Sequence, residues 1–211
     1  MSSDLKPIKL WGKRGPNPPK VAIILSELGL PYEIVDIEFA DLKKPEYLAV
    51  NPNGRAPAIQ DPNNNGFILW ESGAIIEYLV EKYDTQDYKI SFPTGSDKAY
   101  LTKQWLYFQT TGQGPYYGQL IWFKRFHAEK IPSAVERYAK EVNRVTGVVE
   151  KHLAAQRKEY GIEGDSEGPW LVGNKMTFAD LSWYMWQYFA GTACEPDEYK
   201  VSSTPRCDTD L

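Results

Sequence analysis

The sequence predicts an α/β domain followed by an all-α domain, and three observations support this. Strand-like and helix-like apolar patterns alternate from residue 7 to residue 83, and no strand pattern follows. The next segment, 84–97 (DTQDYKISFPTGSD), is polar and holds proline and glycine, as linkers do. From about residue 97 apolar residues recur at helical spacing. We therefore expect domains over 6–85 and 97–190, the first a layered α/β unit and the second all-helical.

The first part predicts the element order β-α-β-α-β-β-α. Val21, Ile24, Leu25 and Leu28 follow the i, i+3, i+4, i+7 spacing of a helix face, and Gly29 ends that helix. The other expected elements are short apolar runs: a strand at 8–12, a second at 31–39, one or two helical turns at 43–50, a hairpin of 56–59 and 67–70, and a helix at 71–83.

The second part predicts helices only. Its clearest signal is one apolar stripe over five turns, formed by Val135, Tyr138, Val142, Val145, Val149 and Leu153. Thr177 and Asp180 in "TFAD" predict a variant capping box, in which Thr177 caps the first turn of a helix and Asp180 reaches back to the amide of Thr177. "GQGP" at 112–115 predicts a loosened helix.

Composition excludes several classes of function. With a net charge of −4 the chain has no basic field for nucleic acid, and it holds no apolar run long enough to span a bilayer. Only two cysteines, Cys194 and Cys207, occur, so we expect a cytoplasmic protein without a disulfide framework. No Cys/His cluster has metal-ligand spacing, so we expect no metal, and His127 and His152 are expected on helix surfaces.

Three local features predict one pocket in the first domain. Asn17 lies in "KRGPNPPK", at the start of a helix; Pro57 in "GRAPAI" opens a strand and is a candidate for a cis bond; Glu71 and Ser72 begin another helix. Such a helix start favours a carboxylate, and Glu71 can accept from an ammonium, so the pair suits the head of an amino acid. Taken singly, Asn17 also fits a helix cap, Pro57 a strand-edge proline, and Glu71 or Ser72 ordinary first-turn residues.

These stretches resemble the glutathione S-transferase family. "GPNPPKVAIILSELGLPYE", "NPNGRAPAI" and "WESGAIIEYLVEKY" are similar to landmarks of its thioredoxin-like domain. "QWLYFQTTGQGPYYGQ", "HAEKIPSAVERYAKEVNRVTGVVEKHLAAQR" and "WLVGNKMTFADLS" are similar to the fungal branch that includes the yeast nitrogen-regulator prion protein, with the bacterial nu class as its nearest enzymatic relative. The resemblance covers about residues 7 to 188.

The resemblance implies a glutathione site. Asn17 would hydrogen-bond the glutathione sulfur, Ala56 would pair its backbone with the cysteinyl part beside a cis-Pro57, and Glu71 and Ser72 would hold the γ-glutamyl head. Leu42 stands where relatives have a polar side chain for the glycyl carboxylate, and Lys43 or Lys44 can take that part. The expected glutathione-binding residues are Asn17, Lys44, Arg55, Ala56, Pro57, Glu71 and Ser72.

The resemblance also places Tyr107, Phe108 and Tyr116 at the site of a hydrophobic co-substrate, although aromatics at helical spacing usually belong to the core. The function it implies is a dimeric glutathione transferase that uses glutathione as co-substrate and acts on a small hydrophobic electrophile. Glutathione-dependent disulfide reduction and a non-catalytic, glutathione-binding regulator are the alternatives, and fold resemblance alone does not choose among them.

The end of the chain departs from the family pattern. "FAGTACEPDEYKVSSTPRCDTDL" is polar and carries no helical stripe, so 191–211 is expected to be a divergent, disordered tail. It fits either a truncated or out-of-frame product, which would impair activity, or a genuine divergent end. If so, Trp183, Trp186 and Phe189 are expected to be partly uncovered.

Overall fold

A mixed four-stranded sheet forms the N-terminal part of the protein. The structure, a computed structural model, describes residues 5–164 and 167–193. The strands are β1 (Ile8–Trp11), β2 (Tyr32–Val35), β3 (Ala58–Asp61) and β4 (Phe67–Trp70), in the order β2-β1-β3-β4. β1 and β2 are parallel, whereas β1–β3 and β3–β4 are antiparallel. The β3–β4 hairpin confirms the one expected from the sequence.

Helices α1 (Asn17–Glu27), α2 (Pro45–Leu48) and α3 (Ser72–Tyr83) complete this part, together with the short 3₁₀ turns Phe39–Asp41 and Pro62–Asn64. Gly29 follows α1 with a φ of +65°, a left-handed conformation that ends a helix at little cost for glycine. The order β-α-β-α-β-β-α is confirmed.

The remainder is helical, as predicted. It contains α4 (Asp97–Phe108), α5 (Gly114–Ile121), α6 (Pro132–Glu159) and α7 (Phe178–Ala193), with two wider π-helical turns at Gln109–Gln113 and Trp122–Phe126. The first of these turns lies directly before Gly114 and Pro115, where the sequence predicts a loosened helix. In the described part of the chain no helix combines the length and apolarity needed to cross a membrane.

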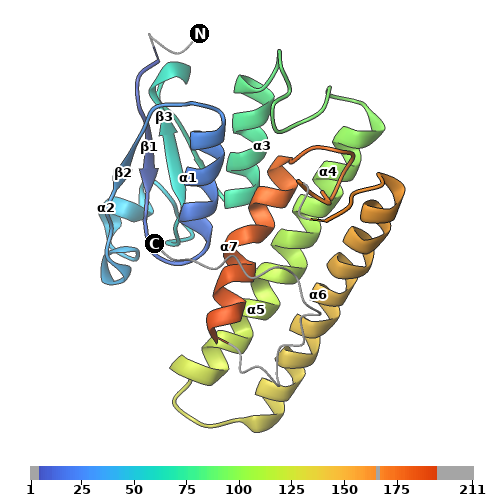
Figure 1. The fold of residues 1–211 in the computed structure, drawn as a ribbon. Helices are drawn as coiled ribbons and strands as arrows, with labels where there is room; N and C mark the ends of the chain where they lie inside the picture. Colours follow the sequence, from blue (N-terminus) through green and yellow to red (C-terminus); the bar gives the residue numbers. More distant parts are fainter. Residues whose placement is uncertain (1–4, 165–166, 194–211) are drawn as a thin grey trace.

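Helix α7 is the central element of the molecule. It packs against α1 of the sheet domain and against α4 and α5 of the helical domain, and Figure 1 shows it running between them. Phe178 and Leu106, from the helical domain, join the core cluster of the sheet domain, which includes Ile8, Ile24 and Ile75. The two domains therefore share a continuous apolar contact.

The aromatic residues of α7 correct one expectation. Trp183 and Trp186 are 6% and 9% exposed, so the prediction that they are partly uncovered is wrong for both tryptophans, whereas Phe189 is half-buried. Both tryptophans belong to the second core cluster, with Val142 and Val145 of the predicted α6 stripe. They are covered because α7 is enclosed by α1, α4 and α5. The predicted tail lies outside the described residues from residue 194 onward.

The capping box at α7 is confirmed in part. The carboxylate of Asp180 accepts from the Thr177 backbone N–H at 2.8 Å, as predicted. It also accepts from the Thr177 hydroxyl at 2.7 Å and from the Leu171 N–H at 2.7 Å, so the hydroxyl binds Asp180. Asp180 thus fixes the start of α7 to the loop before it.

We predict that Gly12→Ala destabilises the protein by about 1–3 kcal/mol. Gly12 has a φ of +95°, and a Cβ there would lie 2.7 Å from the Cβ of Ala56 and 3.2 Å from Cγ of Pro18. Thermal unfolding measures the loss. Gly147→Ala on α6 is the control: a Cβ meets nothing within 4 Å there, so it should be neutral or raise stability by about 0.5–1 kcal/mol. Equal effects of the two changes would contradict the prediction.

Candidate functional site

The strand register brings the three sequence-predicted features to one edge of the sheet. Trp11, Ala58 and Trp70 form one row across β1, β3 and β4. β1 ends at Trp11 and leads to Asn17; the Ala56–Pro57 bond precedes β3; β4 ends at Trp70, and Glu71 and Ser72 follow. Each of the three segments directly precedes or follows one residue of this row. The three segments therefore lie next to one another. Two helices, α1 and α3, begin at this edge.

Asn17 is the first residue of α1. The capping position is occupied by Pro16, and no side chain caps the helix. The hypothesis that Asn17 merely caps α1 is therefore wrong. The turn before it is held to the segment after β2 by ion pairs of Lys13 with Asp36 and of Arg14 with Glu38.

The Asn17 side chain binds α7. Its Oδ1 accepts a hydrogen bond of 2.9 Å from Nε1 of Trp186. Nδ2 of Asn17 has no hydrogen-bond partner within residues 5–164 and 167–193. An amide N–H₂ at the N-terminus of an eleven-residue helix, where backbone N–H groups lack intrahelical partners, suits an anionic acceptor.

The loop before β3 holds its backbone with two buried donors. The Ala56–Pro57 peptide bond is cis, as the sequence predicts. The carbonyl oxygen of Arg55 accepts from the Tyr47 hydroxyl at 2.8 Å and from Nδ2 of Asn51 at 2.5 Å. These contacts fix the peptide that leads into Ala56, while the side chain of Arg55 is exposed. Tyr47 and Asn51 are not among the residues predicted from the sequence, although an asparagine in "NPNG" is typical of turns.

Glu71 and Ser72 lie at the start of α3, as predicted. Glu71 has a φ of +71°, a conformation that costs a non-glycine residue about 1–3 kcal/mol and that is common at ligand sites. Its Oε1 lies 3.5 Å from Nδ2 of Asn53. Ser72 is the first helical residue and is 7% exposed. A carboxylate and a hydroxyl therefore stand together at the positive end of a twelve-residue helix.

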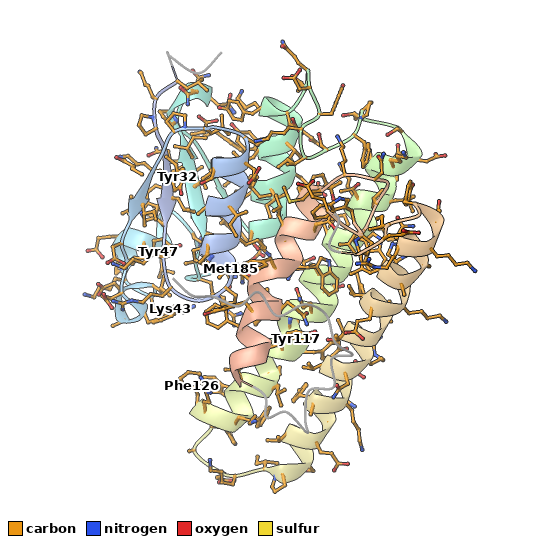
Figure 2. All side chains as sticks on the ribbon, in the orientation of Figure 1. Tyr32, Lys43, Tyr47, Tyr117, Phe126 and Met185 are labelled. Atoms are coloured by element: carbon orange, nitrogen blue, oxygen red, sulfur yellow. The ribbon has the colours of Figure 1, made fainter. Side chains whose placement is uncertain are left out.

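The two lysines near Leu42 differ in their contacts. Lys43 donates to the backbone carbonyl of Asn53 at 2.8 Å, in the same loop as Arg55 (Lys43 is labelled in Figure 2). Lys44 instead pairs with Asp41 at 2.5 Å, and that hydrogen bond raises the pKa of its ammonium. Lys43 therefore contacts the loop, whereas Lys44 is engaged with its neighbour on the chain.

A buried lysine lies on α1, close to the sheet edge that carries Asn17. Lys20, one turn after Asn17 on α1, is 1% exposed, and its Nζ donates to Oε1 of Gln109 at 2.8 Å. Nε2 of Gln109 donates to Oε1 of Gln113 at 3.0 Å, and Nε2 of Gln113 donates to the Trp183 carbonyl at 3.1 Å. Burial lowers the pKa of Lys20 to about 7, and the negative charge of Glu71 opposes that shift. The network joins α1 to the π-helical turn and to α7, and the sequence analysis did not identify it.

The three residues expected at the co-substrate site have different neighbours in the structure. Phe108 packs against Trp183 with ring centroids 5.4 Å apart and lines a groove of about 550 Å³ between α4 and α6. Tyr116 lies 6.5 Å from the ring of Tyr138 on α6. Tyr107 is 56% exposed, and the nearby charge of Glu77 raises the pKa of its hydroxyl.

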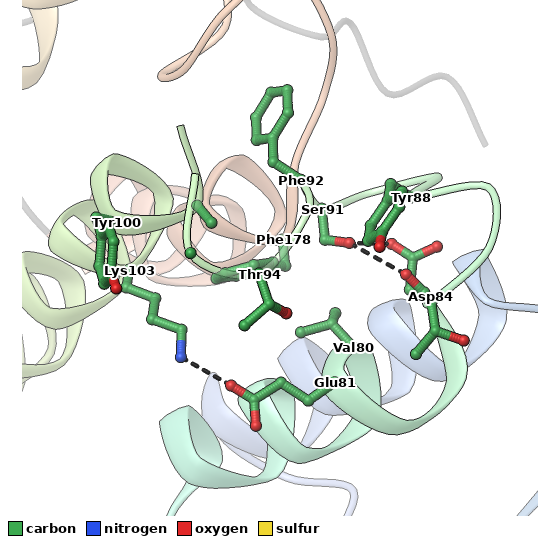
Figure 3. A pocket seen from close by; sticks show the side chains of 13 residues that line it. Val80, Glu81, Asp84, Tyr88, Ser91, Phe92, Thr94, Tyr100, Lys103 and Phe178 are labelled. Atoms are coloured by element: carbon green, nitrogen blue, oxygen red, sulfur yellow. Dashed lines mark hydrogen bonds and ion pairs between the residues drawn. The ribbon is translucent and has the colours of Figure 1, made fainter. Parts of the chain in front are cut away.

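A cavity of about 210 Å³ lies between the end of α3, the segment 84–96 and the start of α4 (Figure 3). The Lys103–Glu81 pair, at 2.8 Å, and the Ser91–Asp84 hydrogen bond, at 2.6 Å, lie on its wall. None of the residues that line this cavity or the groove at Phe108 belongs to the edge that carries Asn17, Ala56 and Ser72.

Both histidines lie in the helical part of the chain. Within the described ranges, no group of three or more His, Cys, Asp or Glu residues is placed to hold a metal ion. His152 lies on α6 and is half-buried: its Nε2 lies 2.7 Å from the Leu171 carbonyl, and its ring lies 4.5 Å from that of Trp105. The expectation for His127 is wrong, because it follows the second π-helical turn and does not lie on a helix.

We predict that Lys20 makes stability depend on pH. Between its folded pKa of about 7 and its unfolded value of 10.5, the unfolded chain binds a proton that the folded chain does not, so stability rises with pH. The slope contributed by one such group is at most roughly 1.4 kcal/mol per pH unit. Lys20→Met should remove this slope, so that its stability relative to the native protein falls between about pH 7 and pH 10.

Chemical denaturation at several pH values measures this relative stability. Any cost of leaving Gln109 without its donor is constant with pH and does not affect the slope. Lys151→Met, an exposed position on α6, controls for the loss of one positive charge. A pH-independent difference between Lys20→Met and the native protein would contradict the prediction.

Two family models match the chain, and curated fungal proteins are similar over almost all of it. The glutathione S-transferase N-terminal domain matches residues 6–81, and the C-terminal domain of the same family matches residues 118–204. The glutathione S-transferase-like protein gedE of Aspergillus terreus is 61% identical over 96% of this chain and 88% of its own length. The similarly named tpcF of Aspergillus fumigatus is 56% identical over the same shares, 96% and 88%.

Solved structures of the same kind superpose closely. The glutathione transferase URE2P8 of Phanerochaete chrysosporium, solved with oxidized glutathione, has a TM-score of 0.81 and 43% identity, over 93% of this chain and 86% of that one. Ure2p in complex with S-hexylglutathione has a TM-score of 0.84 and 40% identity, over 92% and 89%. With its thioredoxin-like sheet domain and helical domain, the chain belongs to the glutathione S-transferase family.

Proposed function

We propose that the protein binds glutathione, stabilises its thiolate with Asn17 and transfers it to a small hydrophobic electrophile. The observation that carries this proposal is the row of Trp11, Ala58 and Trp70, which gathers the segments of Asn17, Ala56 and Glu71 at one edge of the sheet. That edge combines an amide donor, a fixed backbone segment and a helix N-terminus bearing a carboxylate.

The chemistry depends on the pKa of the bound thiol. A free thiol has a pKa of about 8.5 and is mostly protonated at neutral pH. A donated hydrogen bond from Nδ2 of Asn17 and the N-terminus of α1 both favour the thiolate, so the pKa falls and the proton leaves to solvent. The thiolate then forms a bond to the electrophilic carbon, and the leaving group departs with the electron pair of the broken bond.

The rest of glutathione would bind along the same edge. The backbone of Ala56, positioned by the cis-Pro57 bond and by the anchored Arg55 carbonyl, would pair with the cysteinyl part. Ser72 would bind the γ-glutamyl carboxylate, and Glu71 its ammonium. Lys44, released from Asp41, or Lys43 would take the glycyl carboxylate beside Arg55.

The relatives support glutathione as the ligand. URE2P8 was solved with oxidized glutathione and Ure2p with a glutathione that carries a hexyl group on its sulfur. An S-hexyl group resembles the product of transfer to an apolar carbon, which favours a hydrophobic co-substrate. Tyr107, Phe108 and Tyr116 remain our candidates for that second site, although the rings of Phe108 and Tyr116 have neighbours within the helical domain.

Disulfide reduction is the second candidate, because URE2P8 was solved with oxidized glutathione. Here the thiolate of glutathione attacks one sulfur of a substrate disulfide, a mixed disulfide forms, and the other sulfur leaves as a thiolate; a second glutathione completes the reduction. Assays with an aryl halide and with a small disulfide separate the two activities. If glutathione raises the melting temperature but neither substrate turns over, the protein is a glutathione-binding regulator and the proposed transfer is wrong.

We further propose that the protein acts in the cytoplasm as a homodimer. Light scattering of the purified chain tests the second part, since it distinguishes the mass of one 24.1 kDa chain from that of two.

We predict that Asn17→Ala raises the pKa of the bound thiol by roughly 1 to 2 units, because a hydrogen bond to a charged group contributes about 1.5–3 kcal/mol. At pH values below the native thiol pKa the transfer rate should fall roughly tenfold to a hundredfold, and by less at higher pH. The pH–rate profile and the ultraviolet absorbance of the thiolate at saturating glutathione measure the shift.

Asn143→Ala is the matched control, since the amide of Asn143 lies on α6 and donates to the Ala139 carbonyl at 2.9 Å. It should leave the thiol pKa unchanged. If Asn17→Ala retains the native pH–rate profile, the role assigned to Asn17 is wrong.

A further inference from the structure

We propose that Trp186 is a positioning residue that orients the Asn17 amide, so that Nδ2 faces the glutathione sulfur. The inference rests on the proposed function, because it concerns how Asn17 performs the role given to it there. It assigns part of the thiol chemistry to the helical domain, since Trp186 lies on α7 and Asn17 on α1.

The chemistry of the two side chains decides which atom of the amide faces which way. An indole N–H only donates, so the atom 2.9 Å from Trp186 Nε1 is an acceptor, the Asn17 oxygen. A flipped amide would place its N–H₂ against the indole N–H, two donors facing one another. A half-turn about the last side-chain bond of an asparagine exchanges its oxygen and its nitrogen. The indole prevents this exchange and so fixes where Oδ1 and Nδ2 lie.

Trp186 is itself held in place by close packing on α5. It is 9% exposed. A Cβ added at Gly114 would lie 3.5 Å from its Nε1, and one at Gly118 would lie 3.4 Å from its Cη2. The indole thus rests on two glycines one helical turn apart, where the backbone of α5 comes close. Rotation of the ring away from Asn17 is restricted by this surface.

The fixed orientation bears directly on the sulfur. With Oδ1 occupied by Trp186, the remaining polar atom of the side chain is Nδ2, a donor that stabilises a thiolate. Without the indole the amide is free to present its oxygen, whose lone pairs repel a thiolate. A population of flipped amides would raise the average pKa of the bound thiol.

The test compares thiol pKa values at saturating glutathione in the native protein and four variants. Trp186→Phe removes the N–H and keeps an apolar ring. It should raise the thiol pKa, and the rise should be at most as large as the one caused by Asn17→Ala. Combining Trp186→Phe with Asn17→Ala should give the pKa of Asn17→Ala alone, because Trp186 acts through Asn17. Trp183→Phe is the matched control. Trp183 also lies on α7, but its Nε1 donates to the Trp105 carbonyl at 3.1 Å and not to Asn17.

The control separates stability from positioning. Both Phe variants lose a buried indole N–H and ring volume, so both should lower the melting temperature. Only Trp186→Phe should move the thiol pKa and the acidic limb of the pH–rate profile. If Trp186→Phe does not fold, site-specific incorporation of 3-benzothienylalanine at position 186 replaces the N–H by sulfur within the same ring shape, and the same shift is expected.

The possible outcomes distinguish the inference from the function beneath it. If Asn17→Ala raises the thiol pKa but neither change at position 186 does, the positioning role is wrong and the proposed function stands. If Trp186→Phe raises the pKa equally with and without Asn17, Trp186 acts independently and the inference is again wrong. If Asn17→Ala leaves the pKa unchanged, both are wrong.

Discussion

The contact between α1 and α7 is the interaction on which the rest of the structure depends. It joins the sheet domain to the helical domain, and its polar part is the hydrogen bond from Trp186 to Asn17. The same interface between the two domains contains Lys20, whose Nζ donates a hydrogen bond to Gln109 in the π-helical turn. Because buried polar groups need partners, these bonds fix the relative position of the two domains more specifically than apolar packing does. The candidate site therefore cannot be assigned to the sheet domain alone.

The sheet contributes the second constraint, its register. Each of the three candidate segments is short and would have no defined position by itself. The Trp11–Ala58–Trp70 row places them at one edge, and secondary contacts then refine each one: Tyr47 and Asn51 bind the Arg55 carbonyl, and Trp186 binds Asn17. The strained Glu71 is held where β4 passes into α3. Rigid elements thus position a site built from loop and helix-terminal residues.

The sequence predicts those parts of the site that have a local signature. Asn17 among prolines, Pro57 before a strand and Glu71–Ser72 before a helical pattern can all be recognised within a few residues, and the fold follows from alternating periodicity. Pairings between distant residues have no such signature. Trp186 and Asn17 are 169 positions apart and Lys20 and Gln109 are 89 apart, and a lysine on a helix is ordinarily exposed. For the same reason the expectation that Trp183 is uncovered is wrong, since only tertiary packing covers it.

The proposed mechanism requires that the Asn17 amide presents Nδ2 to the sulfur of bound glutathione. A crystal structure of the protein with reduced glutathione tests this claim most directly. We expect the sulfur to lie within hydrogen-bond distance of Nδ2 of Asn17 while Trp186 still donates to Oδ1. A sulfur that contacts other groups, or glutathione bound away from the edge formed by Asn17, Ala56 and Ser72, would contradict it.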